Sequence, residues 1–373
     1  MRCVHVFSGD LWAGAEVATV RLVQELARRP GVEVRVVTLN DGAPAAALRQ
    51  SGICVDVFSE ARMGFTAISV ATIRLARAWK PDVIHSHRYK EHLIAATSAA
   101  ACGAAHVRTA HGLPPMLAWE DRVVGLGGLL DSALSNWVGS HWIAVSAELA
   151  RNISGMRRDV RVIPNGLPPE VPPPARRELL EAFGLSEPVR VLGFVGRLEE
   201  VKRPDRFIRI LRALPPIIAG VPVVAVLVGD GSLRQAVSRL VSLERLERRV
   251  RMLGAVDDGD RIVGALDVLV IPSDHEGHPM VLLEAMRAET AVVASRVGGI
   301  PEVLGSVPWV VPPTNESAMA EAVRRLLENG DERAAWCRTL RQSFTERYTI
   351  ATTVDRTLAF YRELLGSTAI AHG

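Results

Sequence analysis

The chain has 373 residues, and its content of 48% hydrophobic and 23% charged residues is typical of a folded globular protein with two ordinary domains. The formal net charge is only +3, and no basic stripe with interleaved aromatic residues occurs, so the sequence argues against nucleic-acid binding. The four cysteines are scattered without a C-x-x-C pair. This spacing argues against a disulfide framework or a cysteine zinc site, and it predicts a reducing, cytoplasmic location.

The first residues pass directly into an apolar strand pattern (RCVHVFS), so we expect no signal peptide. No apolar run approaches the roughly 18 residues of a membrane-spanning helix. Residues 1–170 hold 18 Lys+Arg and 15 Asp+Glu, whereas the remainder holds 26 of each. This small surplus favours an anionic partner for the first part of the chain, although a solvated surface is the simpler interpretation.

Short apolar runs alternate with helix-length patterns along the whole chain. In the first half these runs are CVHVFS, VEVRVVTL, DVIHSH, HWIAVS and VRVIPN. In the second half they are VRVLGFVG, VPVVAVLVG, VRMLGAV, DVLVIPS, TAVVAS and VPWVVPP. Helix patterns such as EVATVRLVQELARR and DRFIRILRALPP separate them. Near-continuous Val, Ile and Leu strands between helices predict an α/β protein with doubly wound parallel sheets, covered on both faces.

A proline-rich segment divides this pattern. Residues 167–178 (LPPEVPPPARRE) contain five prolines, which remove amide donors and favour an extended chain, as in an inter-domain linker. We therefore expect one domain at residues 1–170 and a second at residues 171–350. A last helical segment follows within residues 351–373.

The most informative stretch is SDHEGHPMVLLEAMRAETAVVASRVGGIPEV, at residues 273–303. It follows a predicted buried strand, DVLVIPS, and places Glu276 and Gly277 in the loop at the carboxyl end of that strand. MVLLEAMRA then predicts the first turns of a helix, with Pro279 tolerated near its start. A loop between a strand end and a helix N-terminus is where open α/β sheets bind ligands.

The spacing E-G-x-P-x-x-L-x-E-A-M, followed by VVAS-x-VGGIPEV, resembles the donor-site motif of glycosyltransferase family 4. Further motifs of that family occur in the same order along nearly the whole chain: SGDLWAGAE, AHG, VSAELA, IPNG, GFVGRLEEVKRPD and LVGDGSLR. The resemblance implies the GT-B arrangement, in which two Rossmann-like domains face each other across a cleft. It also implies an acceptor-side domain at 1–170, a nucleotide-sugar donor domain at 171–350, and a terminal helix in 351–373 that crosses back to the first domain.

A nucleotide-diphosphate sugar requires positive charge around its diphosphate. Arg197 and Lys202 follow the strand pattern VRVLGFVG, and Lys202 is one of only three lysines among 44 basic residues. A compact ammonium suits a phosphate point contact, and a guanidinium can bind two oxygens. The resemblance assigns both residues to the diphosphate, whereas a solvated helix start is the plainer interpretation.

Two carboxylates eight residues apart suit the hydroxyl groups of the donor. Glu284 can accept two hydroxyl hydrogen bonds, as a ribose diol requires, and the resemblance gives it that role. Glu276 resembles the carboxylate that contacts the transferred sugar, although either side chain can also be a charge favoured by a helix start. The backbone that can approach the sugar and phosphate closely comprises Gly277, His278, Pro279, Met280 and Val281.

Two positions depart from the family pattern. Ala13 and Gly14 follow the first strand and can point amides at phosphate, but the family usually has Gly-Gly there. If the first position needs a positive φ, alanine costs about 1 kcal/mol or more. Glu289 stands where the family usually has glycine, which predicts a remodelled turn behind the site.

Several histidines are candidate site residues. His111, in TAHG, resembles the histidine that lies beside the donor sugar in the family, although a strand-end histidine bonded to backbone is the alternative. His85, His87 and His92 form a dense cluster, but no third ligand spacing is defined, so a metal site is the less favoured interpretation. His87 can instead line the acceptor side.

Two further patterns resemble ligand motifs without completing them. Gly229 and Gly231 make half of a dinucleotide fingerprint, but Arg234 replaces the third glycine. Asp258 and Asp260 form a D-x-D pattern, yet they directly precede a helix pattern, so a helix cap is favoured over a metal site.

The segment at residues 113–138 is rich in leucine and tryptophan and poor in charge. A buried helix of the first domain is the favoured interpretation. The alternative is a surface that docks on an anionic membrane or on a lipid-linked acceptor. In that case the protein would be peripheral at the inner face of the membrane.

We therefore expect a metal-independent hexosyltransferase that needs no cofactor, and the resemblance implies that it retains the configuration of the sugar. Its donor would be a UDP- or GDP-sugar, and its acceptor a hydroxyl group of a sugar, a lipid-linked molecule or another compound, in the biosynthesis of cell-surface polysaccharide, glycolipid or glycoconjugate. The expected catalytic residues are Glu276, His111, Arg197 and Lys202. The alternatives are a nucleotide-sugar epimerase of the same fold and a subunit that binds donor without turnover.

Overall fold

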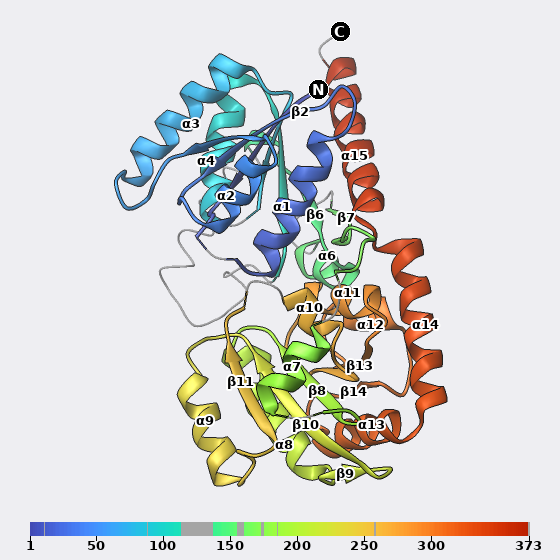
Figure 1. Ribbon diagram of the computed structural model, residues 1–373. Coiled ribbons are helices and arrows are strands. Elements are labelled where there is room, and N and C mark those ends of the chain that lie inside the picture. Colours follow the sequence, from blue (N-terminus) through green and yellow to red (C-terminus); the bar gives the residue numbers. More distant parts are fainter. Residues whose placement is uncertain are drawn as a thin grey trace. The chain divides into compact units, whose positions relative to one another are not determined.

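The computed structural model describes residues 1–10, 12–87, 89–112, 137–154, 160–172, 175–184, 186–256 and 259–371. The chain divides into two compact α/β units (Figure 1). Unit 1 comprises Met1–Pro168 and Ile350–Gly373, and unit 2 comprises Pro169–Thr349. These bounds differ by one or two residues from the ranges expected from the sequence.

Unit 1 is built on a seven-stranded parallel sheet with the order β3-β2-β1-β4-β5-β6-β7. Its strands are β1 (Arg2–Phe7), β2 (Glu33–Thr38), β3 (Cys54–Val57), β4 (Val83–Ser86), β5 (Ala105–Ala110), β6 (His141–Ala144) and β7 (Val160–Val162). Its described helices are α1 (Gly14–Ala27), α2 (Ala43–Gln50), α3 (Phe65–Trp79), α4 (Tyr89–Cys102), α6 (Ala147–Ser154) and α15 (Ile350–Ala371).

The alternation of side chains along β1 divides the core of unit 1 between two faces. Val4 and Val6 pack in the cluster that α3 and α4 complete. Cys3 lies on the other face, where Val354 and Tyr361 of α15 pack against the sheet. The last helix of the chain therefore belongs to the core of the first unit, and Figure 1 shows it beside α1.

Unit 2 repeats this architecture with the strand order β11-β10-β8-β12-β13-β14, to which β9 adds an antiparallel edge. Its strands are β8 (Arg190–Val195), β9 (Ile217–Ile218), β10 (Val221–Val228), β11 (Val250–Gly254), β12 (Val268–Ile271), β13 (Ala291–Ser295) and β14 (Val310–Val311). Its helices are α7 (Arg176–Phe183), α8 (Pro204–Ala213), α9 (Arg234–Leu243), α10 (Gly259–Val263), α11 (Met280–Arg287), α12 (Ile300–Leu304), α13 (Glu316–Glu328) and α14 (Gly330–Arg347), with the 3₁₀ turn η2 (Glu200–Lys202).

Each sheet reverses its strand order beside its first strand. In unit 1 the reversal lies between β1 and β4, and in unit 2 it lies between β8 and β12. The carboxyl ends of the strands at such a reversal diverge and leave room for a ligand. The loops that follow β1, β4, β8 and β12 are therefore where functional side chains are expected.

The predicted α/β class is confirmed, because both units are doubly wound parallel sheets. The sequence missed β3 and β9. β3 is a half-buried edge strand whose four residues include Asp56, and β9 has only two residues, so neither produces a long apolar run. No helix in the described parts of the chain combines the length and apolarity needed to cross a membrane.

Two sequence interpretations fall on residues outside the described ranges. Of the apolar segment at 113–138, only Trp137 and Val138 are described. Trp137 is exposed, and Val138 packs against the α3 and α4 side of the unit 1 core. Asp258 also lies outside the described residues, so its role as a helix cap is not tested.

Candidate functional site

The structure brings Lys202 and Glu276 into direct contact. Lys202 ends η2 after β8, and Glu276 lies in the loop after β12, so they come from the two strands beside the reversal of the unit 2 sheet. Lys202 Nζ lies 2.7 Å from both carboxylate oxygens of Glu276, and Ser273 Oγ donates to Oε1 at 2.7 Å. The Glu276 side chain is 6% exposed and that of Lys202 is 25% exposed. The arrangement presents an ammonium beside a carboxylate at the edge where ligands bind.

Glycine holds the Glu276 loop in place. Gly298 has a φ of +56°, and a Cβ at this position would lie 1.5 Å from the carbonyl oxygen of Glu276. Gly299 N donates to the carbonyl oxygens of Glu276 and Gly277 at 3.2 and 3.1 Å. The first glycine of the Gly-Gly pair in the sequence motif is therefore needed, because the backbone after β13 lies against the backbone of the site loop.

Arg206, on α8, contacts and supports the same loop. Its guanidinium, only 4% exposed, donates to the carbonyl oxygen of Pro272 and to Asp274 Oδ1. Arg203 donates to the other oxygen of Asp274 at 2.9 Å. The loop that carries Glu276 is thus tied to α8 by charge-assisted hydrogen bonds, which restrict its conformation.

Arg197 lies exposed in the loop after β8, where its side chain can reach a ligand. The two glycines of the G-D-G pattern explain how this loop is held. A Cβ on Gly229 would lie 1.9 Å from the carbonyl oxygen of Gly196, and one on Gly231 would lie 2.6 Å from that of Leu198. The G-D-G pattern therefore serves the close approach of two loops, which accounts for its incomplete match to a dinucleotide fingerprint.

The helix α11 begins at Met280, with Pro279 as its N-cap. Glu284 lies half-buried on α11, one turn beyond Met280 and beside the half-buried Val281. His278 is buried, and burial lowers its pKa to about 4, so its ring is neutral near pH 7. Neutral His278 therefore contributes no positive charge toward a phosphate.

Two side chains behind the site have structural roles. Asp260 lies in the first turn of α10 and pairs with the buried Arg287 at 2.7 Å, which favours packing over metal binding. Glu289 has a φ of +56° in the turn between α11 and β13. The turn thus has the left-handed conformation that glycine favours, and Glu289 adopts it at a cost in strain. The turn therefore keeps a glycine-type conformation, and the expected remodelling is not observed at this residue.

In unit 1, Ala13 is the N-cap of α1 and Gly14 is its first residue. The φ of Ala13 is −128°, an extended conformation that alanine adopts without strain. The penalty anticipated for a positive φ at this position is therefore absent. The exposed Gly14 and the half-buried Ala13 remain available to a ligand at the end of β1.

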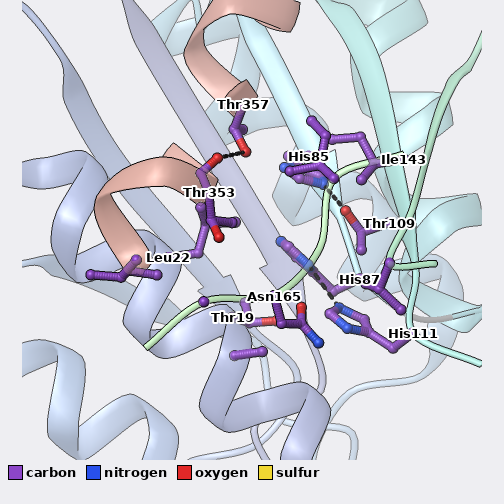
Figure 2. Close-up of a pocket in the computed structure, with 15 residues that line it drawn as sticks. Thr19, Leu22, His85, His87, Thr109, His111, Ile143, Asn165, Thr353 and Thr357 are labelled. Atoms are coloured by element: carbon purple, nitrogen blue, oxygen red, sulfur yellow. Dashed lines mark hydrogen bonds between the residues drawn. The ribbon is translucent and has the colours of Figure 1, made fainter. Parts of the chain in front are cut away.

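His111 lies half-buried after β5 and beside a small cavity of unit 1 (Figure 2). The cavity has a volume of about 20 Å³, enough for a water molecule. None of the described residues that line it is charged. Its polar lining residues are Thr19, His85, His87, Thr109, His111, Asn165, Thr353 and Thr357.

The histidine cluster differs from the one expected. His5, His85 and His87 each bring a ring nitrogen within 4.8 Å of the others, and all three are buried. His92 instead accepts or donates in a separate contact with Ser86 Oγ, at 2.7 Å. Burial, together with neighbouring imidazoles, lowers the pKa of His85 and His87 well below the usual range.

Sequence reasoning missed three residues that the structure brings to these sites. Ser273 ends the apolar run of β12, and its contact with Glu276 depends on the fold of the loop. Arg206 follows Asp205 in a helix pattern that has the appearance of a solvated face. His5 alternates with Val4 and Val6 on a buried strand, and a polar residue at such a position was the available signal.

Profiles of two known families match the chain. The profile of glycosyltransferase family 4 matches residues 12–171, and that of glycosyl transferases group 1 matches residues 189–329. The alpha-maltose-1-phosphate synthase of Mycolicibacterium smegmatis is 28% identical, over 95% of this chain and 96% of that protein. The 2-deoxystreptamine N-acetyl-D-glucosaminyltransferase of Streptomyces fradiae is 27% identical, over 96% of this chain and 92% of that protein.

Solved structures share the fold. Anabaena Alr3699/HepE in complex with UDP-glucose aligns with a TM-score of 0.84 at 22% identity, over 98% of this chain and 100% of that one. Sucrose-phosphate synthase from Thermosynechococcus elongatus aligns with a TM-score of 0.78 at 19% identity, over 98% and 100%. Because the two profiles together match more than half of the residues and relatives align along nearly the full length, the chain belongs to glycosyltransferase family 4 and is a glycosyltransferase of the GT-B type.

Proposed function

We propose that this glycosyltransferase moves a sugar from a nucleotide-diphosphate sugar, a UDP- or GDP-sugar, to a hydroxyl acceptor with retention of configuration and without a metal ion. The observation that carries the proposal is the contact between Lys202 and Glu276 at the reversal of the unit 2 sheet. An ammonium and a carboxylate held side by side suit the two parts of such a donor: the ammonium can bind the anionic diphosphate, and the carboxylate can accept hydrogen bonds from the sugar hydroxyls.

The donor is assigned to unit 2. Lys202 and Arg197 would contact the diphosphate, with the backbone from Gly277 to Val281 at the start of α11 adding its positive dipole end. Glu276 would accept hydrogen bonds from the transferred sugar, and Glu284 from the ribose diol. This chain shares its fold with the Anabaena protein that was solved in complex with UDP-glucose, and this likeness supports a nucleotide-sugar donor.

The reaction requires stabilisation of a departing anion. The bond between the anomeric carbon and the phosphate oxygen breaks, and its electron pair stays with the diphosphate. Lys202, Arg197 and the α11 amides would stabilise that charge as it develops, in a site already organised by Ser273 and Gly298. The acceptor oxygen then bonds to the anomeric carbon on the face from which the diphosphate left, and the hydroxyl proton passes to an oxygen of the departing diphosphate.

The acceptor side is assigned to unit 1. His111 would hydrogen-bond the transferred sugar, and the amides at Ala13 and Gly14 would approach the donor phosphate. The unstrained φ of Ala13 removes one of the two departures that had favoured a subunit without turnover.

Metal independence is proposed because Glu276 at the unit 2 site and Asp260 behind it already have partners of another kind. Glu276 is paired with Lys202, and Asp260 with Arg287. A divalent ion needs several free oxygen ligands, and these pairs would have to break to supply them.

The test begins with a panel of nucleotide sugars. A donor that binds only the native state raises the melting temperature, so thermal shifts identify the base and the sugar. The stabilising donor is then offered with hydroxyl acceptors in EDTA, and NMR determines the anomeric configuration of the product. Retained configuration and activity in EDTA are expected. An inverted product, or activity that EDTA abolishes and magnesium or manganese restores, would contradict the proposal.

The same assay separates the alternatives. A nucleotide-sugar epimerase would convert the donor without needing an acceptor. A subunit without turnover would be stabilised by donor and form no product with any acceptor. Lys90→Ala is the matched control for variants of Lys202, because Lys90 pairs with Glu60 at an exposed position of unit 1.

A further inference from the structure

The loop that carries Glu276 and the turn that carries Lys202 are also joined through Asp274. The backbone N–H of Asp274 donates to the carbonyl oxygen of Val201 at 2.9 Å, and Val201 directly precedes Lys202 in η2. Asp274 in turn lies two residues before Glu276. A hydrogen bond between main chains therefore connects the two segments, in addition to the contact between the ammonium and the carboxylate.

The carboxylate of Asp274 is held at both oxygens. Arg206 Nη2 donates to Oδ1 at 2.8 Å, and Arg203 Nη1 donates to Oδ2 at 2.9 Å. Burial opposes ionisation of Asp274, but the hydrogen bonds from Arg203 and Arg206 outweigh it and lower the pKa of this carboxyl, so it is charged near pH 7. The side chain of Asp274 therefore has a fixed orientation although it is 44% exposed.

Arg206 fixes this loop at two points. Its Nη1 donates to the carbonyl oxygen of Pro272 while its Nη2 donates to Asp274. Between these two residues lies Ser273, whose hydroxyl donates to Glu276 Oε1 at 2.7 Å. A guanidinium is planar and rigid, so the two donors of Arg206 set the backbone on one side of Ser273 relative to the side chain on the other.

Arg203 bends the chain immediately after Lys202. Its φ is +54°, and it ends η2 and begins α8. A non-glycine residue in this conformation is strained and persists where its surroundings hold it. The guanidinium of Arg203 donates to both oxygens of Asp205 at 3.0 Å and to Asp274. The bend that places Lys202 is therefore held by contacts that include the Glu276 loop.

We propose that Asp274 and Arg206 are positioning residues, which join the loop after β12 to η2 and so keep Lys202 in contact with Glu276. The consequence for sugar transfer rests on the proposed function, whereas the joint between the two segments does not. The Arg206 side chain is only 4% exposed, and a buried charge must regain the free energy of its lost hydration. Its two donors to one loop explain the presence of this charge as a means of fixing geometry.

A network that merely fastens α8 to the rest of unit 2 is the competing explanation. Arg209, one turn further along α8, already makes such a fastening, because it donates to Asp205 and to both oxygens of Glu316 on α13. None of its hydrogen bonds among the described residues reaches the loop at 272–276. Arg209→Met is therefore the matched control for Arg206→Met, since both remove a guanidinium from the same helix and the same network.

The contact of Lys202 can be observed directly, because Lys80, Lys90 and Lys202 are the only lysines in the sequence. Labelling lysine with ¹⁵N at Nζ gives three ammonium signals in the full chain, and Lys80→Arg and Lys90→Arg identify two of them. We expect the Lys202 hydrogens to exchange with water more slowly than those of Lys90, whose partner Glu60 is at an exposed position. Equal exchange would mean that Glu276 does not hold Lys202, which contradicts the proposal.

The variants test what maintains this contact. Arg206→Met removes both donors to the loop, so hydrogen exchange at Lys202 should become about tenfold faster, whereas Arg209→Met should leave it unchanged. Unchanged exchange at Lys202 in folded Arg206→Met, or an equal change in Arg209→Met, overturns the proposal. If Arg206→Met does not fold, Asp274→Asn decides. It keeps the backbone N–H but loses the charge that both guanidinium groups contact, and unchanged exchange at Lys202 in this variant overturns the proposal.

Transfer activity tests the proposed function separately. In Arg206→Met we expect kcat to fall about tenfold with donor KM unchanged, because Lys202 can still bind the diphosphate but is no longer aligned with Glu276. In protein that already carries Glu276→Gln, Arg206→Met should cause no further loss. Additive losses would show that Arg206 acts by another route and overturn the proposal. If exchange at Lys202 changes while kcat does not, the joint stands and the proposed role of the Lys202–Glu276 pair in transfer is wrong.

Discussion

The two units organise their site edges with different chemistry. At the unit 1 edge, the hydrogen bonds from His5 through His87 to His111 join neutral groups. At the unit 2 edge, the contact between Lys202 and Glu276 joins opposite charges. The same doubly wound sheet therefore supports a neutral hydrogen-bonding site in one half of the chain and a charged site in the other.

This difference has a physical consequence for pH. Burial lowers the pKa of His5 to about 3, which keeps it neutral where an exposed histidine would titrate. In unit 2, burial opposes ionisation of Asp205, but hydrogen bonds from Arg203 and Arg209 outweigh it and lower its pKa to about 2. Unit 1 must therefore exclude protons from its interior, whereas unit 2 must keep its carboxylates ionised.

The largest predicted effect of this contrast is on acid stability. Among the described residues, unit 1 buries five histidines with lowered pKa values and unit 2 buries one. These five are His5, His85, His87, His92 and His106. Below pH 6.5 the unfolded chain binds protons that the folded unit excludes, so the free energy of unfolding falls by about 1.4 kcal/mol per pH unit for each such histidine. The stability is fully present above pH 6.5 and is lost as pH falls toward 3.

Unit 2 should lose its carboxylate contribution in a lower window. The stability from Asp205 is present above its ordinary value of 3.8 and is lost as pH falls toward about 2. Hydrogen exchange at pH 7, 6 and 5, corrected for the intrinsic exchange rate, should therefore report opening of β4 and β5 before β12 and β13. Equal loss of protection in both units would contradict the prediction that unit 1 is the more sensitive to acid.

The second prediction concerns the charged site. Glu276→Gln keeps the shape of the side chain but removes the charge that Lys202 contacts, so sugar transfer should fall about 100-fold through lost positioning of the sugar. The fold and the affinity for the nucleotide diphosphate should persist, because Lys202 is left free to bind phosphate. Steady-state kinetics and nucleotide titration measure the two effects. Unchanged turnover in a folded variant removes Glu276 from the site.

The third prediction separates binding from stability at Lys202. Lys202→Ala should lower the transfer rate at least about tenfold, equivalent to 1.4 kcal/mol, because the departing diphosphate loses a positive contact. It should also lower the melting temperature, since Glu276 is left buried without its partner. Adding Glu276→Gln should restore the melting temperature. The control Lys90→Ala should alter neither the rate nor the melting temperature, and an unchanged rate in folded Lys202→Ala would show that Lys202 acts only on stability.

The smallest predicted effect lies behind the unit 2 site. Glu289→Gly should relieve the left-handed strain at φ +56° and raise the free energy of unfolding by up to about 1 kcal/mol, reduced by the greater freedom of glycine in the unfolded chain. Ala288→Gly, next to it at a φ of −84°, should instead lower the free energy of unfolding by about 0.5–1 kcal/mol. Urea unfolding measures both. A destabilised Glu289→Gly would mean that the glutamate side chain makes a compensating contact.

Much of the unit 2 site could be predicted from the sequence because its residues lie in short, ordered motifs. Glu276, Gly277 and Glu284 fall within nine residues between a strand and a helix, so local spacing places them at one strand end. The contact between Lys202 and Glu276 could not be predicted, because 74 residues separate them and only the adjacency of β8 and β12 brings them together.

Less of the unit 1 site could be predicted from the sequence. His85 and His87 were visible as an alternating pair, but the third imidazole is His5, which is 80 residues earlier than His85 and pairs with it across β1 and β4. The sequence favoured His92 for the cluster because it is near in the chain. Register between parallel strands depends on the packing of both sheet faces, which no local pattern records.

The sequence by itself determined the fold class, the family and the strand-end position of the candidate site residues, because apolar periodicity and turn residues act over a few neighbouring positions. Only the tertiary structure decided which of those residues meet. It paired Lys202 with Glu276 and set Gly298 against the Glu276 carbonyl. Each of these contacts depends on strand order and close packing between segments distant in the chain, and these are properties of the folded chain as a whole.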